Sequence, residues 1–189
     1  GLEPMLGDTH LRVISVQGFP PASEPGFLDA LNALGFPYRW TTRFIAMDKA
    51  KATKELNKYR KQWFAKRKSV AALIKETLFN EESVLVDADA DNKAADADAA
   101  LQELGADDVA FGYFTASIVL SDHDRDVVVA QVREVERVLN GRGFATIQEN
   151  VNAVEAWLGG IPGHLYANIR QPLIHTLNLA HLAPLSAVW

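Results

Sequence analysis

The sequence predicts an α+β fold, in which two strand–helix–strand units are separated by a long helical insertion. Three observations predict it. A strand pattern, a helix pattern and a second strand pattern occur in that order over residues 11–47 and again over residues 111–148. Residues 49–79 contain neither Gly nor Pro, which favours a long helix. The composition, 48% hydrophobic and 23% charged, is sufficient for a globular core.

The first unit begins with a strand over residues 11–19, where apolar residues alternate before a Gly-Phe-Pro-Pro turn. We expect a helix to follow, because Ser23 is a good N-cap and Gly35 supplies a stop. Its apolar face would contain Phe27, Leu28, Leu31 and Leu34. Residues 38–47 predict the second strand, since they are rich in aromatic and β-branched types.

The second unit begins with a strand over residues 111–120. Ser121 or Asp122 is then expected to cap a helix that ends at residues 140–143, and residues 144–148 predict the fourth strand. The apolar stripe of this helix contains Val128, Val132, Val135 and Leu139. The order of elements predicts a ferredoxin-like split βαβ sandwich with a long helical insertion between strands two and three, plus C-terminal helices.

The insertion, residues 48–108, is expected to form a two-helix arm. Its first helix would cover residues 49–79, and a weaker alanine-rich helix would cover residues 92–104. Charge divides the arm, because residues 48–68 are strongly basic whereas residues 81–108 are strongly acidic. One interpretation is that the two blocks neutralise each other across a helical hairpin.

Motifs for catalysis, cofactors or metals are missing from the sequence. No Gly is followed by Lys, so the chain lacks the GxxxxGK-Ser/Thr loop that binds nucleotide phosphates. The five histidines have no HExxH spacing and there is no cysteine, which disfavours a zinc site and fits a reducing compartment. We therefore assign no catalytic, cofactor-binding or metal-binding residue.

Residues 87–98 partly match a calcium loop, with carboxylates at the first, third and fifth positions. Asn92 stands where the loop needs Gly, and Asp98 is shorter than the bidentate Glu of such loops. A solvated acidic segment is therefore the favoured interpretation.

The basic helix over residues 49–68 leaves two interpretations open. Tyr59, Trp63 and Phe64 lie among its cations, which is compatible with a nucleic-acid-binding module. The favoured interpretation is a solvated helix with inward-packed aromatic residues, which could also dock on an acidic protein. An RNA-recognition fold fits less well, because Phe111 replaces the basic residue of its strand motif.

The C-terminal segment, residues 161–189, carries a single charge, Arg170. Such an apolar segment would leave a hydrophobic surface unless a neighbour covers it. We therefore expect the chain to be a fragment of a longer protein. The expected division is an α+β domain over residues 1–160 and an apolar segment, residues 161–189, that leads to a further domain.

The final third of the chain resembles the TrbE-like members of the type IV secretion ATPase family (CagE/TrbE/VirB). The resemblance is dense over residues 140–189 and looser back to Leu11. It is carried by Asn140-Gly141-Arg142-Gly143-Phe144, by the run from Glu149 to Gly163, by Asn168-Ile169-Arg170, by Asn178-Leu179-Ala180 and by the run from Pro184 to Trp189.

The resemblance implies a parent protein that hydrolyses ATP, with Mg²⁺, to power conjugation or pilus assembly. Its motor domain and phosphate-binding loop would follow Trp189, so no catalytic residue is carried over onto this chain. The chain itself would be a non-catalytic docking and oligomerisation domain, peripheral at the cytoplasmic face of the inner membrane. Its expected partners are its own ATPase domain, inner-membrane components of the secretion system and further copies of itself; nucleic acid is possible but not favoured.

Two groups of residues are the predicted partner-binding positions. They are the basic and aromatic residues of the arm and the apolar residues of the C-terminal segment: Lys58, Arg60, Lys61, Trp63, Lys66, Arg67, Leu177, Leu179, Leu182 and Trp189.

Overall fold

The computed structural model describes residues 3–20, 22–61 and 88–183. The chain divides into two compact units. We call residues 1–45 and 112–189 the sheet unit, and residues 46–111 the arm unit.

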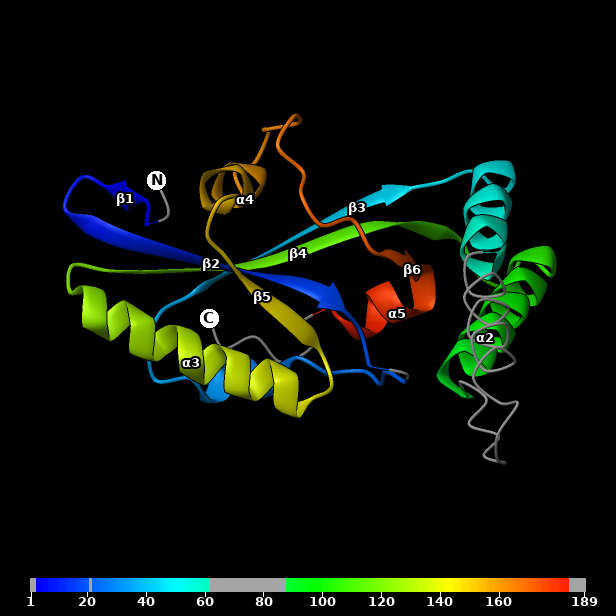
Figure 1. The fold of residues 1–189 in the computed structure, drawn as a ribbon, viewed down its shortest axis with the longest axis horizontal. Coiled ribbons are helices and arrows are strands. Elements are labelled where there is room, and N and C mark those ends of the chain that lie inside the picture. Colours follow the sequence, from blue (N-terminus) through cyan, green and yellow to red (C-terminus); the bar gives the residue numbers. More distant parts are fainter. Residues whose placement is uncertain (1–2, 21, 62–87, 184–189) are drawn as a thin grey trace, which may run out of the picture. The chain divides into compact units, whose positions relative to one another are not determined.

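The sheet unit is built on an antiparallel arrangement around strand β2 (Figure 1). The strands are β1 (Met5–Leu6), β2 (Thr9–Gly18), β3 (Arg39–Ala46), β4 (Phe111–Asp122), β5 (Ala145–Glu149) and β6 (Leu173–His175). Strand β2 pairs antiparallel with β1, β4 and β5. Strand β4 also pairs with β3 and β6, so the principal order is β5-β2-β4-β3. The four predicted strands are confirmed, each within two residues of its expected bounds.

Alternation along β2 gives the sheet two different faces. Ile14 and Val16 point to one face and lie in the main core, whereas Val13 and Ser15 lie on the other. The main core is completed by helix α3 (Arg125–Gly141), whose predicted apolar stripe is at most 2% exposed. Figure 1 shows α3 on one side of the sheet and the short helix α4 (Ala153–Gly159) on the other.

The predicted helix over residues 122–139 is confirmed, but its N-cap is different. Asp124 is the cap, and its carboxylate accepts a hydrogen bond from the Asp126 amide at 2.8 Å. Ser121 and Asp122 belong to β4, because that strand extends as far as its pairing with Leu11 and His10 allows.

The predicted helix over residues 23–35 is wrong. Only a 3-10 helix, η1 (Asp29–Ala33), forms there. Gly26 has φ +75°, which interrupts an α-helix at its first turn. The Ser23 hydroxyl does not cap the segment but lies 2.9 Å from Nδ1 of His181 and accepts a hydrogen bond from Asn178. The apolar pattern nevertheless predicted burial correctly, since Leu31 lies in the main core.

The arm unit contains helical residues 49–61 and helix α2 (Ala88–Gly105). The Asp48 carboxylate caps the first of these helices by accepting from the Lys51 amide at 2.7 Å. The rest of the predicted first helix, residues 62–79, lies outside the described residues. The ends of the arm meet, because the Met47 amide donates to the Phe111 carbonyl at 2.9 Å. The predicted α+β class is confirmed.

Candidate functional site

The face of the sheet opposite α3 combines a small apolar cluster with a polar one. The apolar cluster contains Val13, Val119 and Ala156. Beside it, Ser15 and Ser117 are direct partners in the β2–β4 register, and the Ser117 hydroxyl lies 2.8 Å from that of Thr41 on β3.

A segment that follows α4 covers this polar cluster, and Arg43 on β3 fixes its backbone. The guanidinium donates to the carbonyls of Gly159 and Ala167, both at 2.9 Å, and to the carbonyl of His164. Gly159 allows the close approach, since a Cβ there would lie 2.9 Å from the Ala167 oxygen. Arg43 therefore holds the two ends of one loop, residues 159–167, against the sheet. We call this segment the clamped loop.

Three further contacts fix the chain immediately after the clamped loop. Thr115 donates to the Asn168 side chain at 2.5 Å, and the Phe114 amide donates to the Pro172 carbonyl at 2.8 Å. Arg170 donates to both carboxylate oxygens of Glu149, at 2.9 and 3.2 Å, and this hydrogen bonding raises the Arg170 pKa. The Glu149 side chain is only 1% exposed, so the ion pair is shielded from solvent on its acidic side.

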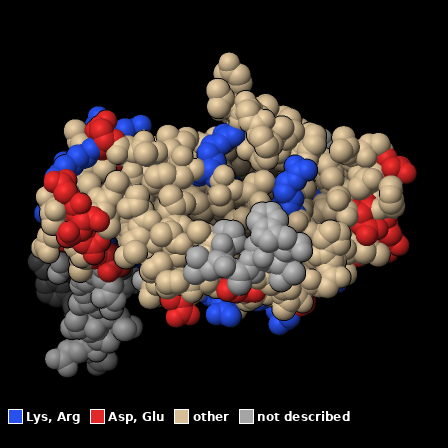
Figure 2. Space-filling view, turned by 180° about the vertical axis from the view of Figure 1, so that it is seen from behind, with Lys and Arg blue, Asp and Glu red and all other residues tan. Residues whose placement is uncertain are grey.

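The tip of the clamped loop is apolar and exposed. Leu165 is 79% exposed and Tyr166 is 95% exposed. Figure 2 shows the tip as an uncharged projection above the body of the sheet unit. An open hollow of about 390 Å³ adjoins it, lined by Thr41, Thr42, Arg43 and the loop from Gly159 to Leu165. The chain thus carries a projection and a hollow on one loop.

The apolar C-terminal segment is partly built into the sheet unit. Strand β6 pairs with β4, and Ile174 and Leu182 lie in the main core. Of the predicted partner-binding residues in helix α5 (Thr176–His181) and just after it, Leu182 is 4% exposed and Leu179 packs against the core. Leu177 is 53% exposed and is available at the surface, whereas Trp189 lies outside the described residues.

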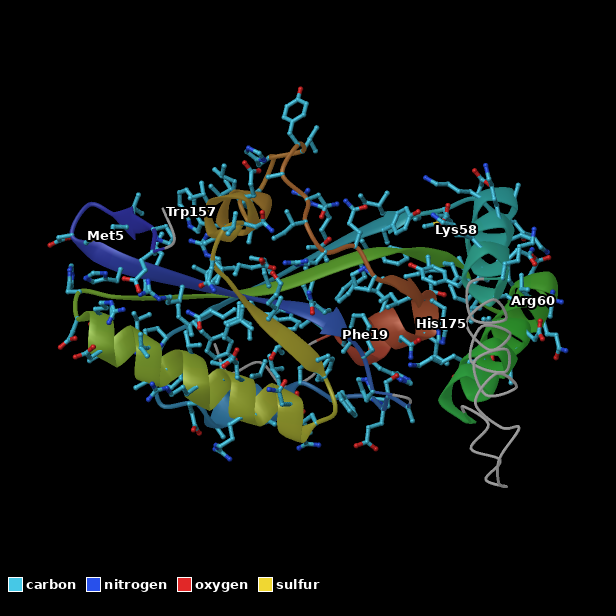
Figure 3. All side chains as sticks on the ribbon, viewed as in Figure 1. Met5, Phe19, Lys58, Arg60, Trp157 and His175 are labelled. Atoms are coloured by element: carbon cyan, nitrogen blue, oxygen red, sulfur yellow. The ribbon has the colours of Figure 1, made fainter. Side chains whose placement is uncertain are left out.

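The basic residues of the arm are partly neutralised within the arm unit. The Arg60 side chain lies 3.1 Å from the Asp98 carboxylate of α2, and Lys49 lies 2.6 Å from Asp107. Figure 3 shows Lys58 and Arg60 on the first arm helix. Lys58 is 4.0 Å from Glu55, and Lys61 is exposed. Trp63, Lys66 and Arg67 lie outside the described residues.

An ion-pair cluster fixes the N-terminal segment. Arg125, the first residue of α3, donates to both oxygens of Glu3 at 2.9 and 2.7 Å. Arg12 on β2 is 3% exposed and lies 3.1 Å from the same carboxylate. The Arg125 hydrogen bonds, aided by the charges of Arg12 and Arg125, lower the pKa of Glu3 from 4.5 to about 2.

In the portion of the chain that the structure describes, no three acidic, His or Cys side chains form a group able to hold a metal ion. Within the same residues, no helix combines the length and the apolarity required to cross a bilayer.

Sequence reasoning did not single out Arg43 or Tyr166. Arg43 was the more visible of the two, because a charged residue inside an aromatic and β-branched strand indicates a specific contact. For Tyr166, the signal was a large aromatic residue that follows the turn-forming pair Pro162-Gly163 closely.

The fold and these surfaces define a mixed α+β chain, whose two outward features are a clamped apolar loop and a charged helical arm. Residues 64–170 match the family described as the CagE, TrbE, VirB family, component of type IV transporter system. The chain belongs to this family, as the resemblance of its final third indicated.

Two relatives match the chain over its whole length. A probable conjugal transfer protein TrbE of Sinorhizobium fredii (strain NBRC 101917 / NGR234) is 38% identical over 189 residues, which are 28% of that protein. The conjugal transfer protein TrbE of Rhizobium radiobacter is 37% identical over 189 residues, 23% of its length. The chain therefore spans about a quarter of the curated relatives that it matches.

Proposed function

We propose that this chain is the non-catalytic docking and oligomerisation domain of a TrbE-like conjugation ATPase. The observation that carries the proposal is the full-length match to about a quarter of two conjugal transfer proteins. A role in a type IV transport system follows from the family. The domain role is supported by the exposed features, because a clamped apolar tip and a charged arm are suited to contact another protein.

In the proposed parent, the remaining three quarters of the protein bind ATP and Mg²⁺ and hydrolyse the nucleotide. The absence of a GxxxxGK-Ser/Thr loop from this sequence agrees with that division of labour. The chain would then contact its own motor domain and the inner-membrane components of the transporter, at the cytoplasmic face of that membrane.

We also propose that the sheet unit is a ferredoxin-like split βαβ sandwich. The order β5-β2-β4-β3 supports this assignment, since it places the first and third strands of the two units at the centre. In this interpretation, η1 replaces the first crossover helix and the arm unit is inserted between β3 and β4.

The domain role is tested by separating transfer from ATP turnover in the full-length parent. Leu177→Glu alters the exposed apolar residue of α5 without disturbing the main core. We expect this variant to retain ATP turnover and to lose conjugal transfer. Val127→Glu is the matched control, because Val127 is also exposed, at 41%, but lies on α3.

Unchanged transfer in the Leu177→Glu variant would count against docking through this segment. ATP turnover by the 189-residue chain alone would contradict the non-catalytic role. Self-association through residues 161–189 is a further expectation, and light scattering over a concentration series measures it. A strictly monomeric chain would contradict the proposed oligomerisation.

A further inference from the structure

Arg43 is bound in a way that leaves its charge only partly compensated. Its donors point to the carbonyls of Gly159, His164 and Ala167, which are dipoles without net charge. Among the described residues, no carboxylate lies within ion-pair distance of the guanidinium. Hydrogen bonds to a guanidinium lie in its plane, so they are compatible with an aromatic ring against its flat face. The hollow that Arg43 lines therefore suits an aromatic side chain.

Tyr166 is the most exposed large apolar or aromatic side chain of the described residues, and it lies on the loop that borders this hollow. The hollow, about 390 Å³, falls at the lower end of pocket sizes that accept small organic groups. Its rim carries the hydroxyls of Thr41 and Thr42, which are hydrogen-bonding partners for a phenol.

We propose that the clamped loop is a self-complementary interface, in which Tyr166 of one copy enters the hollow of a second copy and stacks on its Arg43. A projection and a matching hollow on the same loop allow both insertions at once across a two-fold axis. The uncharged surface of the tip agrees with such a contact, because like charges would otherwise meet at the axis (Figure 2). This inference specifies the surface of the proposed oligomerisation and rests on that element of the proposed function.

The first test is sedimentation equilibrium of the 189-residue chain. We expect Tyr166→Ala to weaken self-association by about tenfold or more, whereas Tyr166→Phe and Tyr166→Trp retain most of it because they keep a stacking ring. Val151→Ala is the matched control, since Val151 is also exposed, at 83%, but lies before α4. Circular dichroism of each variant confirms that the fold is retained.

The second test exploits the absence of cysteine from the sequence. A Leu165→Cys chain is mixed with a Thr42→Cys chain that carries a mass tag, and a short bis-maleimide is added. Leu165 is next to Tyr166 and Thr42 lines the hollow, so we expect a cross-link between the two chains. Replacing Leu165→Cys by Val151→Cys should abolish it.

The results separate this inference from the broader function. Self-association that is unchanged in Tyr166→Ala, or that gives no Leu165–Thr42 cross-link, overturns the inference but leaves oligomerisation through another surface intact. A chain that stays monomeric at every concentration overturns both. Equal weakening by Tyr166→Ala, Tyr166→Phe and Tyr166→Trp also overturns it, because the aromatic ring is then not the contact.

Discussion

Individual side chains decide where the chain comes close to itself, and Arg43 is the clearest example. It joins a strand to a loop more than a hundred residues later, through three carbonyl groups. Such carbonyls lose their partner when the guanidinium is removed, and an unpaired acceptor that is shielded from water is costly.

Arg43→Met tests the clamp, since it keeps an apolar stem and removes every donor. We expect the free energy of unfolding to fall by about 1–3 kcal/mol and chymotrypsin to cleave faster after Tyr166. Urea unfolding and timed proteolysis measure the two effects. Arg39→Met on the same strand is the control, because Arg39 is exposed. Equal effects of both substitutions would mean that Arg43 does not clamp the loop.

Gly112 marks a second close approach, between β4 and β3. A Cβ at this position would lie 2.6 Å from the Ile45 carbonyl oxygen and would also strike the Phe44 ring. We expect Gly112→Ala to reduce the free energy of unfolding by about 1–3 kcal/mol in a urea titration. Gly141→Ala, at the end of α3, has nothing within 4 Å and should be neutral or stabilising. A neutral Gly112→Ala variant would argue against tight β3–β4 pairing.

At the scale of elements, the N-terminal segment depends on one carboxylate that meets two guanidinium groups. Glu3 has its pKa lowered to about 2, so its ionised form is favoured by the folded chain. The corresponding stabilisation is complete above pH 4.5, the ordinary pKa, and is lost as pH falls from about 4.5 to about 2.

Thermal melts of wild type and Glu3→Gln should therefore differ above pH 4.5 and converge near pH 2. Glu24→Gln serves as the control, because Glu24 is an exposed carboxylate for which no ion pair is recorded among the described residues. A difference between wild type and Glu3→Gln that persists unchanged at the acid end of this range would show that the carboxylate charge is not the cause.

The arm carries the alternative of nucleic-acid binding, and its ion pairs disfavour it. Arg60 and Lys49 already meet Asp98 and Asp107. We therefore expect no salt-sensitive binding of single-stranded DNA in a fluorescence anisotropy titration. Binding that weakens steeply with salt and disappears when Lys58, Arg60 and Lys61 are changed to Glu would establish the alternative instead.

For the whole molecule, the contact between the ends of the arm is informative. Met47 and Phe111 are joined by a backbone hydrogen bond of 2.9 Å, as at the base of a β-hairpin. Replacing residues 48–110 with Asn-Gly should therefore leave a folded sheet unit. Two-dimensional NMR measures this through the dispersion of core methyl signals such as those of Ile118. A collapsed spectrum would show that the sheet unit requires the arm.

Much of the local structure was predictable from the sequence. The strands around β2 and β4 followed from alternation and β-branched residues, and α3 followed from its apolar stripe, because these patterns are repeated over ten residues or more. The helix at residues 23–35 failed, since a left-handed Gly26 and a long-range contact of Ser23 with α5 outweighed a favourable local pattern. Strand β6 has only three residues, too few to leave a periodic signal.

The sequence by itself determined the α+β class, the order of the main strands, the opposite charges of the arm and the family. Those properties depend on neighbours in the chain or on similarity along it. Tertiary structure alone decided that Ile174 and Leu182 enter the core and that Arg43 fixes a distant loop so that Tyr166 projects from it. These contacts join residues separated by long stretches of chain, and no local preference specifies which distant partner a side chain will meet.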